Sequence, residues 1–148
     1  MKNVIFFLLM AGPVAAEGPS YSDLATESCL QEAVVIGERQ DCIGASARSC
    51  MADGGGSYVE SICYSEEGVF WDARLNAVYQ EQMSAAQESD PALAGALLRL
   101  QRAWIGYRDA RCDAVFAAWG EGTGRSPAFA ECLMRTTAEQ TIFLERGL

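Results

Sequence analysis

Six cysteines in a chain without histidine place the strongest constraint on how these 148 residues fold. Neighbouring cysteines form three candidate pairs that each enclose glycine: Cys29 with Cys42, Cys50 with Cys63, and Cys112 with Cys132. An even number of cysteines forms a disulfide framework only in an oxidising compartment, because thiols in the cytosol are kept reduced. The pattern therefore predicts disulfides if the chain is exported.

The N-terminus predicts export. Lys2 precedes the apolar residues 4–11, and small residues follow at 14–16. This order is typical of a secretory signal peptide, here residues 1–16, with cleavage after Ala16. The apolar segment is far shorter than the roughly 20 residues that span a bilayer. We therefore expect a periplasmic or secreted protein that does not insert into a membrane after signal cleavage.

Removal of the signal peptide makes the chain more acidic. Cleavage would leave 132 residues and remove Lys2, the sole lysine, so the formal net charge would change from −9 to −10. A chain of this length suits one domain. Its charge repels nucleic acid and anionic lipid and attracts cationic partners, although it also suits a surface that is merely soluble. We expect no nucleic-acid partner.

Apolar residues recur at helical spacing over most of the chain. The three clearest runs extend from Trp71 to Ala86, from Leu93 to Trp119 and from Phe129 to Leu144. Each follows the i, i+3, i+4 pattern of one helix face, and no alternating pattern is long enough to predict a strand. The predicted fold class is all-α, a small disulfide-stapled bundle of antiparallel helical hairpins.

Capping residues predict where two of the long helices begin. Asp90 before Pro91 and Ser126 before Pro127 each place a side-chain acceptor at the N-cap. Proline is favoured at the next position, because the N–H that it lacks has no partner there.

The N-terminal half is predicted from weaker signals. Ser57 and Glu60 have the spacing of a capping box after a triple glycine, so a helix is expected from there to about Ser89. Residues 21–36 are expected to form one helix and residues 41–51 a second, shorter one.

Pairing of neighbouring cysteines would close three turns between helices. A bridge from Cys112 to Cys132 would span the glycine-rich loop 120–126 between two helices. Closing loops of this size contributes about 3 kcal/mol each in the chain-entropy model. Spacing alone does not decide among the possible connectivities of six cysteines, so this pairing is a hypothesis.

The residue types exclude most catalytic sites. Without histidine, the Ser-His-Asp, Cys-His and histidine-metal arrangements are all excluded. No C-x-x-C pair is present, which argues against zinc and against redox chemistry. The loop 120–124 lacks the Lys-Ser/Thr ending of a phosphate-binding motif. We expect neither a metal nor a cofactor.

Paired carboxylates are the remaining catalytic alternative. Glu66, Glu67 and Asp72, or Asp109 with Asp113, have spacings that allow an acid and a base to lie together. Arginines share the helix of the second set, however, and such mixtures are usually salt-bridged surface. We therefore expect that the protein is not an enzyme.

Two segments carry a resemblance to a known family. Residues 71–79 read WDARLNAVY and residues 101–112 read QRAWIGYRDARC, the more specific of the two. With Cys63 before them and Cys132 after them, they resemble the LprI-type lysozyme inhibitor domain over about residues 50–144. The resemblance implies a small, exported, helical, disulfide-linked domain that inhibits a lysozyme.

The resemblance also implies how the chain is divided. After the signal peptide that the N-terminal pattern predicts at residues 1–16, residues 17–49 are expected to form an N-terminal helical hairpin extension and residues 50–148 the LprI-like helical domain. Four cysteines of the predicted framework lie at positions that the resemblance marks, whereas Cys29 and Cys42 belong to the extension.

The motif residues favour a structural interpretation. Trp104 and Tyr107 share a helix face with Leu97 and Leu100, which predicts core packing rather than a ligand-binding aromatic pair. The apolar Leu75 belongs to the preceding helix of the motif. The polar members are predicted to form a network that joins the two helices: Gln101, Arg102, Arg108 and Asp109 against Asp72, Asn76 and Tyr79.

The loop 120–126 is the candidate partner-binding segment, because it presents Glu121 and Arg125 and is rich in glycine. Arg125 inserted beside the catalytic carboxylates of a lysozyme would block substrate through a charge-assisted contact. A plain solvated connection is the alternative. The leading hypothesis is an exported inhibitor that binds a cationic lysozyme. The other is a periplasmic scaffold or interaction module that binds another envelope protein or a cell-wall component without inhibition.

Overall fold

The computed structural model describes residues 18–147, which contain six helices and no strand. Three are short: α1 (Leu24–Glu32), α2 (Ile36–Asp41) and α3 (Ala45–Cys50). Three are long: α4 (Gly56–Ser89), α5 (Pro91–Ala118) and α6 (Arg125–Glu145). The all-α prediction is confirmed. The predicted signal peptide lies outside the described residues.

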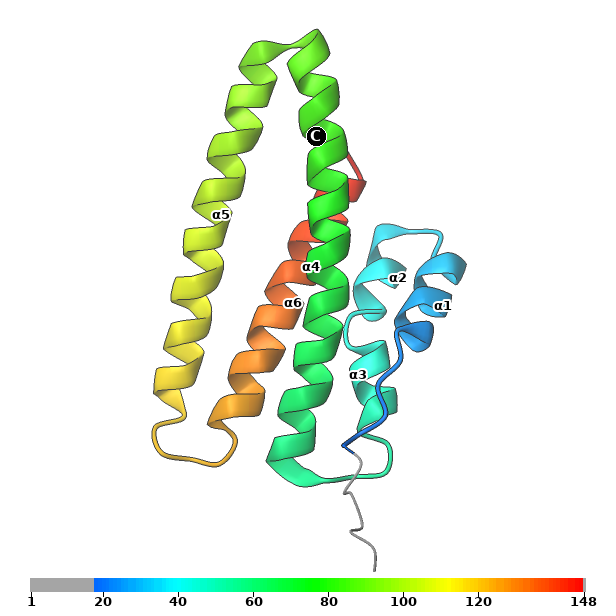
Figure 1. Cartoon of the computed structure of the whole chain (residues 1–148), viewed down its shortest axis with the longest axis vertical. Coiled ribbons are helices and arrows are strands. Elements are labelled where there is room, and N and C mark those ends of the chain that lie inside the picture. Colours follow the sequence, from blue (N-terminus) through cyan, green and yellow to red (C-terminus); the bar gives the residue numbers. More distant parts are fainter. Residues whose placement is uncertain (1–17, 148) are drawn as a thin grey trace, which may run out of the picture.

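Helix α4 is the central element of the fold (Figure 1). It forms an antiparallel hairpin with α5, and α5 forms a second one with α6, which lies between the other two long helices (Figure 1). The short helices α1–α3 lie on the opposite side of α4 from α5. Because α6 has 21 residues against 34 in α4 and 28 in α5, the latter two extend beyond it where they join.

Two apolar clusters form the core. The first contains Trp71 and Met134, both fully buried, and joins α4 and α6 to Leu30 and Ile43 of the N-terminal segment. The second joins the three long helices through Leu75, Trp104 and Leu144. Trp104 lies in the core, as its spacing predicts, and the N-terminal segment is part of the same packed body.

The three disulfides join neighbouring cysteines, as the sequence hypothesis has them. Their Cα–Cα distances are 5.5 Å for Cys29–Cys42, 5.8 Å for Cys50–Cys63 and 5.6 Å for Cys112–Cys132, all within the normal range. The first links α1 to the residue after α2, the second links α3 to α4, and the third links α5 to α6.

Glycines, rather than serines, set the starts of α4 and α6. The predicted capping box of Ser57 is wrong, because α4 begins at Gly56 without a side-chain cap. The backbone turns into α4 at Gly55, whose φ of 127° disfavours any side chain and where a Cβ would collide with Val59. Helix α6 begins at Arg125, so Ser126 is not its N-cap.

The N-terminal segment contains three short helices instead of the predicted two. The predicted helix 21–36 ends at Glu32, because the Glu38 carboxylate accepts the N–H groups of Val34 at 2.7 Å and Val35 at 3.1 Å. These hydrogen bonds hold the pKa of Glu38 below its usual value and let α2 begin at Ile36.

Asp90 is the N-cap of α5, as predicted. Its Oδ1 accepts the N–H groups of Ala92 at 3.0 Å and Leu93 at 3.1 Å, and Pro91 follows at the first helical position. Asp90→Ala should lower the free energy of unfolding by about 1 kcal/mol in urea denaturation, whereas Asp90→Asn should retain most of it. Equal stability of the wild type and Asp90→Ala would contradict this assignment.

Candidate functional site

A groove of about 430 Å³ lies between the three long helices. Phe129, Leu133 and Met134 of α6 form its apolar floor, and Val69 of α4, which is 67% exposed, lies at its edge. Helix α4 passes close to α6 at Gly68, where a Cβ would lie 3.7 Å from the Cβ of Met134, an ordinary van der Waals contact. The groove is thus an exposed apolar surface inside the part of the chain that carries the sequence motifs.

The rim of the groove is acidic. Asp72 of α4 and Asp109 and Asp113 of α5 line it together with one cation, Arg108. Arg108 donates to Asp109 at 2.8 and 2.9 Å and lies 5.2 Å from the centroid of the Trp104 ring. Because Arg108 neutralises one carboxylate, the groove has a net charge of −2 from Asp72 and Asp113.

The predicted polar network between the two motif helices does not form. Asn76 donates to Asp72 of its own helix at 3.0 Å, and Arg108 pairs with its neighbour Asp109. Gln101 instead accepts from Gln140 of α6 at 3.4 Å, and Arg102 is exposed. The physical reason is the position of α6, which lies between α4 and α5 over much of their length (Figure 1).

The prediction that Tyr107 packs in the core is also wrong, again because α6 lies between α4 and α5 (Figure 1). Tyr107 is 56% exposed, and Leu100 on its face is 37% exposed, whereas Leu97 and Trp104 are buried. Tyr79 of α4 is only partly buried, against the cluster that contains Leu75.

The structure brings distant motif residues to one place even without the network. Asp72 from the first motif and Arg108 and Asp109 from the second lie around the same groove. The apolar floor of the groove was not predicted from the sequence. The signal was present, because Phe129 and Leu133 belong to the third apolar run, but the run does not reveal which of its faces remains open.

The loop after α5 places its charged residues differently from the prediction. Arg125 lies 4.4 Å from the centroid of the Phe116 ring and pairs with Glu121 at 3.4 Å. Glu121 is almost fully exposed, and two aromatic residues of this end are exposed as well, Trp119 at 52% and Phe116 at 37%. Arg125 therefore packs on its own hairpin instead of extending from it.

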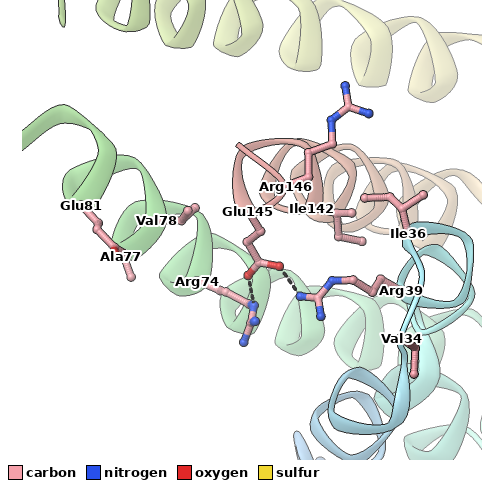
Figure 2. Close-up of a pocket in the computed structure, with 10 residues that line it drawn as sticks. All are labelled: Val34, Ile36, Arg39, Arg74, Ala77, Val78, Glu81, Ile142, Glu145 and Arg146. Carbon is pink, nitrogen blue, oxygen red and sulfur yellow. Dashed lines mark hydrogen bonds and ion pairs between the residues drawn. The ribbon is translucent and has the colours of Figure 1, made fainter. Parts of the chain in front are cut away.

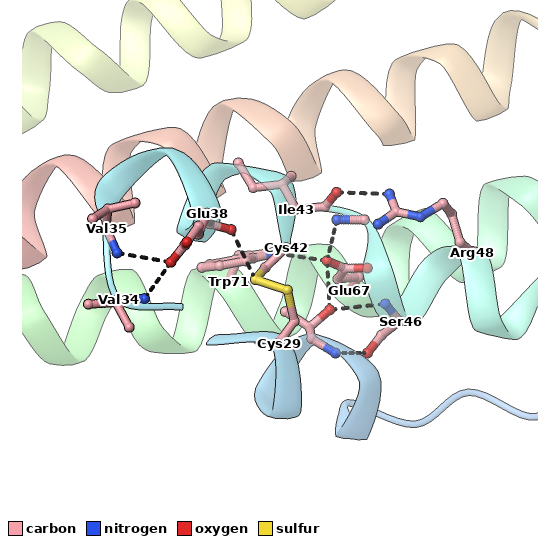
Figure 3. Close-up of a disulfide and its surroundings, with 12 residues drawn as sticks. Cys29, Val34, Val35, Glu38, Cys42, Ile43, Ser46, Arg48, Glu67 and Trp71 are labelled. Atoms are coloured by element: carbon pink, nitrogen blue, oxygen red, sulfur yellow. Dashed lines mark hydrogen bonds between the residues drawn. A yellow bond between two sulfur atoms is a disulfide. The ribbon is translucent and has the colours of Figure 1, made fainter. Parts of the chain in front are cut away.

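The sequence predicted Glu67 only as one of several paired carboxylates, and its buried structural position was not expected. Glu67 is fully buried, and it accepts hydrogen bonds from Thr26 Oγ1, the N–H of Gly44, the N–H of Ala47 and Trp71 Nε1 at 2.7–3.1 Å. Both oxygens are therefore engaged in holding α1 and α3 against α4. Figure 3 shows the bond between Glu67 and Trp71 beside the Cys29–Cys42 disulfide. The helix register contained the signal, because Glu67 stands four residues before Trp71 and four after the buried Cys63.

Residues 18–147 offer neither a metal site nor a membrane span. In this range no cluster of three or more His, Cys, Asp or Glu side chains is placed to bind a metal ion. The same residues include no helix with both the length and the apolar character needed to cross a membrane.

Comparison with known proteins identifies the family. The family model described as lysozyme inhibitor LprI matches residues 50–144, which include both motifs, two of the disulfides and the whole groove. The chain belongs to the LprI family. Its LprI domain thus extends from the end of α3 almost to the end of α6.

Two relatives of this LprI protein carry no assigned function. An uncharacterised protein of Rhizobium meliloti (strain 1021) is 38% identical over 96 residues, which cover 57% of this chain and 68% of the relative. An uncharacterised 17.7 kDa protein from the region 5′ of puhA in Rhodobacter capsulatus is 24% identical over 134 residues, covering 81% and 82%. No solved structure matches this chain significantly.

Proposed function

We propose that this protein is exported and inhibits a lysozyme by binding it. Membership of the LprI family supports the activity. The disulfides support an oxidising location. The observation that carries the choice of surface is the groove, where acidic side chains surround an apolar floor within the family domain.

The chemistry of the groove suits a cationic side chain of the lysozyme. The aliphatic stem of an arginine or lysine would pack on the partly exposed Phe129 and Leu133, and its charged head would reach Asp72 or Asp113. Charge-assisted hydrogen bonds are stronger than neutral ones, and partial exclusion of water by the walls strengthens them further. The net charge of −9 would speed the encounter with a cationic enzyme.

The end of the α5–α6 hairpin extends this surface. Phe129 of the groove contacts Phe116, with ring centroids 5.5 Å apart, and Arg125 lies over the Phe116 ring. Trp119 and Glu121 are exposed side chains of this end, as is Phe116, and Trp119 and Glu121 would contact the lysozyme beside the groove. In this arrangement Arg125 supports the surface, and Arg125→Ala should weaken inhibition less than changes in the groove.

A cell-wall lysis assay with c-type and g-type lysozymes tests the proposal. Purified, oxidised mature protein should slow the fall in turbidity, and the double variant Asp72→Asn, Asp113→Asn should need at least tenfold more protein for the same effect. Tenfold corresponds to about 1.4 kcal/mol, within the range of one charge-assisted contact. Inhibition should also weaken as salt is raised.

A matched variant separates the groove from the overall charge. Asp53→Asn with Glu88→Gln removes two exposed acids away from the groove, so it should inhibit like the wild type. If the two double variants lose inhibition equally, the overall negative charge, and not the groove, would explain the effect. A folded wild-type protein that inhibits neither lysozyme at micromolar excess would overturn the proposal and favour the scaffold alternative.

A further inference from the structure

A second and larger pocket, of about 740 Å³, lies between α2, α4 and the end of α6 (Figure 2). Its lining combines apolar and charged side chains. The apolar ones include Val34, Ile36, Val78 and Ile142, and the charged ones are Arg39, Arg74, Glu81, Glu145 and Arg146. Because 34–39 and 145–146 fall outside the family match of 50–144, much of this pocket belongs to this chain rather than to the shared domain.

Two arginines converge on one carboxylate in this pocket. Arg39 pairs with one oxygen of Glu145 and Arg74 with the other (Figure 2). Each uses a single guanidinium nitrogen, and neither guanidinium group forms another hydrogen bond within residues 18–147. A guanidinium group carries five N–H donors in a planar fork, so most donors of both remain available to a ligand.

The local charge opposes that of the whole protein. The lining includes three arginines and two acids, a sum of +1 in a chain of −9, and two of the arginines, Arg39 and Arg74, converge on Glu145. Arg146 lies 4.9 Å from the centroid of the Phe143 ring, and its guanidinium group points away from the Glu145 carboxylate (Figure 2). The pocket already holds one carboxylate, that of Glu145, through one charge-assisted contact from each of Arg39 and Arg74.

Exposed apolar side chains stand beside these cations. Val34 is 88% exposed and Ile36 is 42% exposed, although both are large apolar residues that line the pocket. Folding alone leaves them in water, whereas a ligand with an apolar chain would cover them.

We propose that this pocket binds a small amphiphilic carboxylate of the fatty-acid type, with its head at Arg39 and Arg74 and its chain along Val34 and Ile36. The carboxylate head of the ligand would accept hydrogen bonds from the guanidinium N–H groups of Arg39 and Arg74 that do not bond to Glu145. The pocket lies within the size range of ligand sites. This inference goes beyond lysozyme inhibition and is independent of the groove.

Isothermal titration calorimetry with dodecanoate, below its micelle concentration and at neutral pH, tests the site. Dodecanoate should bind at least tenfold more tightly than dodecyltrimethylammonium, which has the same chain and the opposite charge. Hexanoate should bind at least tenfold more weakly than dodecanoate, because each buried methylene contributes to affinity. The double variant Arg39→Gln, Arg74→Gln should lose at least tenfold in affinity for dodecanoate.

Two further variants distinguish a ligand site from a purely structural ion pair. Glu145→Gln removes the internal competitor and should bind dodecanoate more tightly, an outcome that a structural role does not predict. Arg111→Gln, which removes an exposed partner of Glu139 at another surface, should bind like the wild type. The proposal is overturned if the cationic amphiphile binds as well as dodecanoate, or if Glu145→Gln and the double arginine variant, both folded by circular dichroism, leave affinity unchanged. The arginine variants should still inhibit lysozyme, so failure here leaves the groove untouched.

Discussion

Replacing Glu67 with glutamine should lower the free energy of unfolding by about 2–4 kcal/mol. Glu67 Oε2 accepts the N–H of Ala47 at 2.7 Å, and Oε1 accepts three donors, among them the N–H of Gly44. A glutamine has one oxygen and one NH₂ group at these positions, so its NH₂ group would face at least one of the donors that bond to Glu67. The strengthening of the hydrogen bonds by the negative charge would also be lost. No water reaches this site to compensate, because Glu67 is fully buried.

Urea unfolding followed by circular dichroism measures this loss. The adjacent Glu66→Gln is the matched control, because Glu66 is exposed and its change should stay within about 0.5 kcal/mol. Native-state hydrogen exchange should also accelerate in α1 and α3 of Glu67→Gln, since this carboxylate holds both against α4. A Glu67→Gln protein as stable as Glu66→Gln would show that the neutral amide replaces the carboxylate fully.

Removing the disulfide between α5 and α6 is expected to have an effect of similar size. The double variant Cys112→Ala, Cys132→Ala should lose about 3 kcal/mol, the value that chain entropy gives for a closed loop of 20 residues. Helix α5 depends on this bridge because it buries only Leu97, Trp104 and Cys112. Its side of the groove, with Asp109 and Asp113, should become mobile, and lysozyme inhibition should fall with it.

The bridge in the N-terminal segment provides the matched comparison. Cys29→Ala with Cys42→Ala opens a loop of 13 residues and should also lose about 3 kcal/mol, but it leaves the groove intact. Thermal unfolding compares the two stabilities, and the lysis assay compares the two activities below the unfolding temperature. If both variants inhibit lysozyme equally well, α5 is not held in place by its disulfide.

The sequence predicted local features of the fold well. Helical spacing identified the long helices and placed Trp71, Leu75 and Trp104 on inward faces, and Asp90 marked the start of α5. These predictions succeed because side-chain spacing and capping depend on residues within one or two turns of a helix. The predicted helix starts at Ser57 and Ser126 were wrong, because glycines occupy the N-cap positions and the helices begin at Gly56 and Arg125 instead.

The candidate site was predictable only in part. Its rim residues were singled out one by one, since Asp72, Arg108 and Asp109 stand in the family motifs. Their meeting around an open groove was not expected, because the same residues were predicted to bond to one another across two touching helices. Glu67 was recognised as an acid within a helix but not as the buried link to the N-terminal segment.

The sequence by itself determined the helical class and the family to which the chain belongs, whereas it offered the pairing of neighbouring cysteines only as a hypothesis. Only the tertiary structure decided which helix covers which face. Helix α6 lies between α4 and α5, so Tyr107 is exposed, the polar network does not form, and an acidic groove stays open above Phe129 and Leu133. Periodicity states which side chains share a face, whereas the partner of that face depends on contacts between residues far apart in the chain.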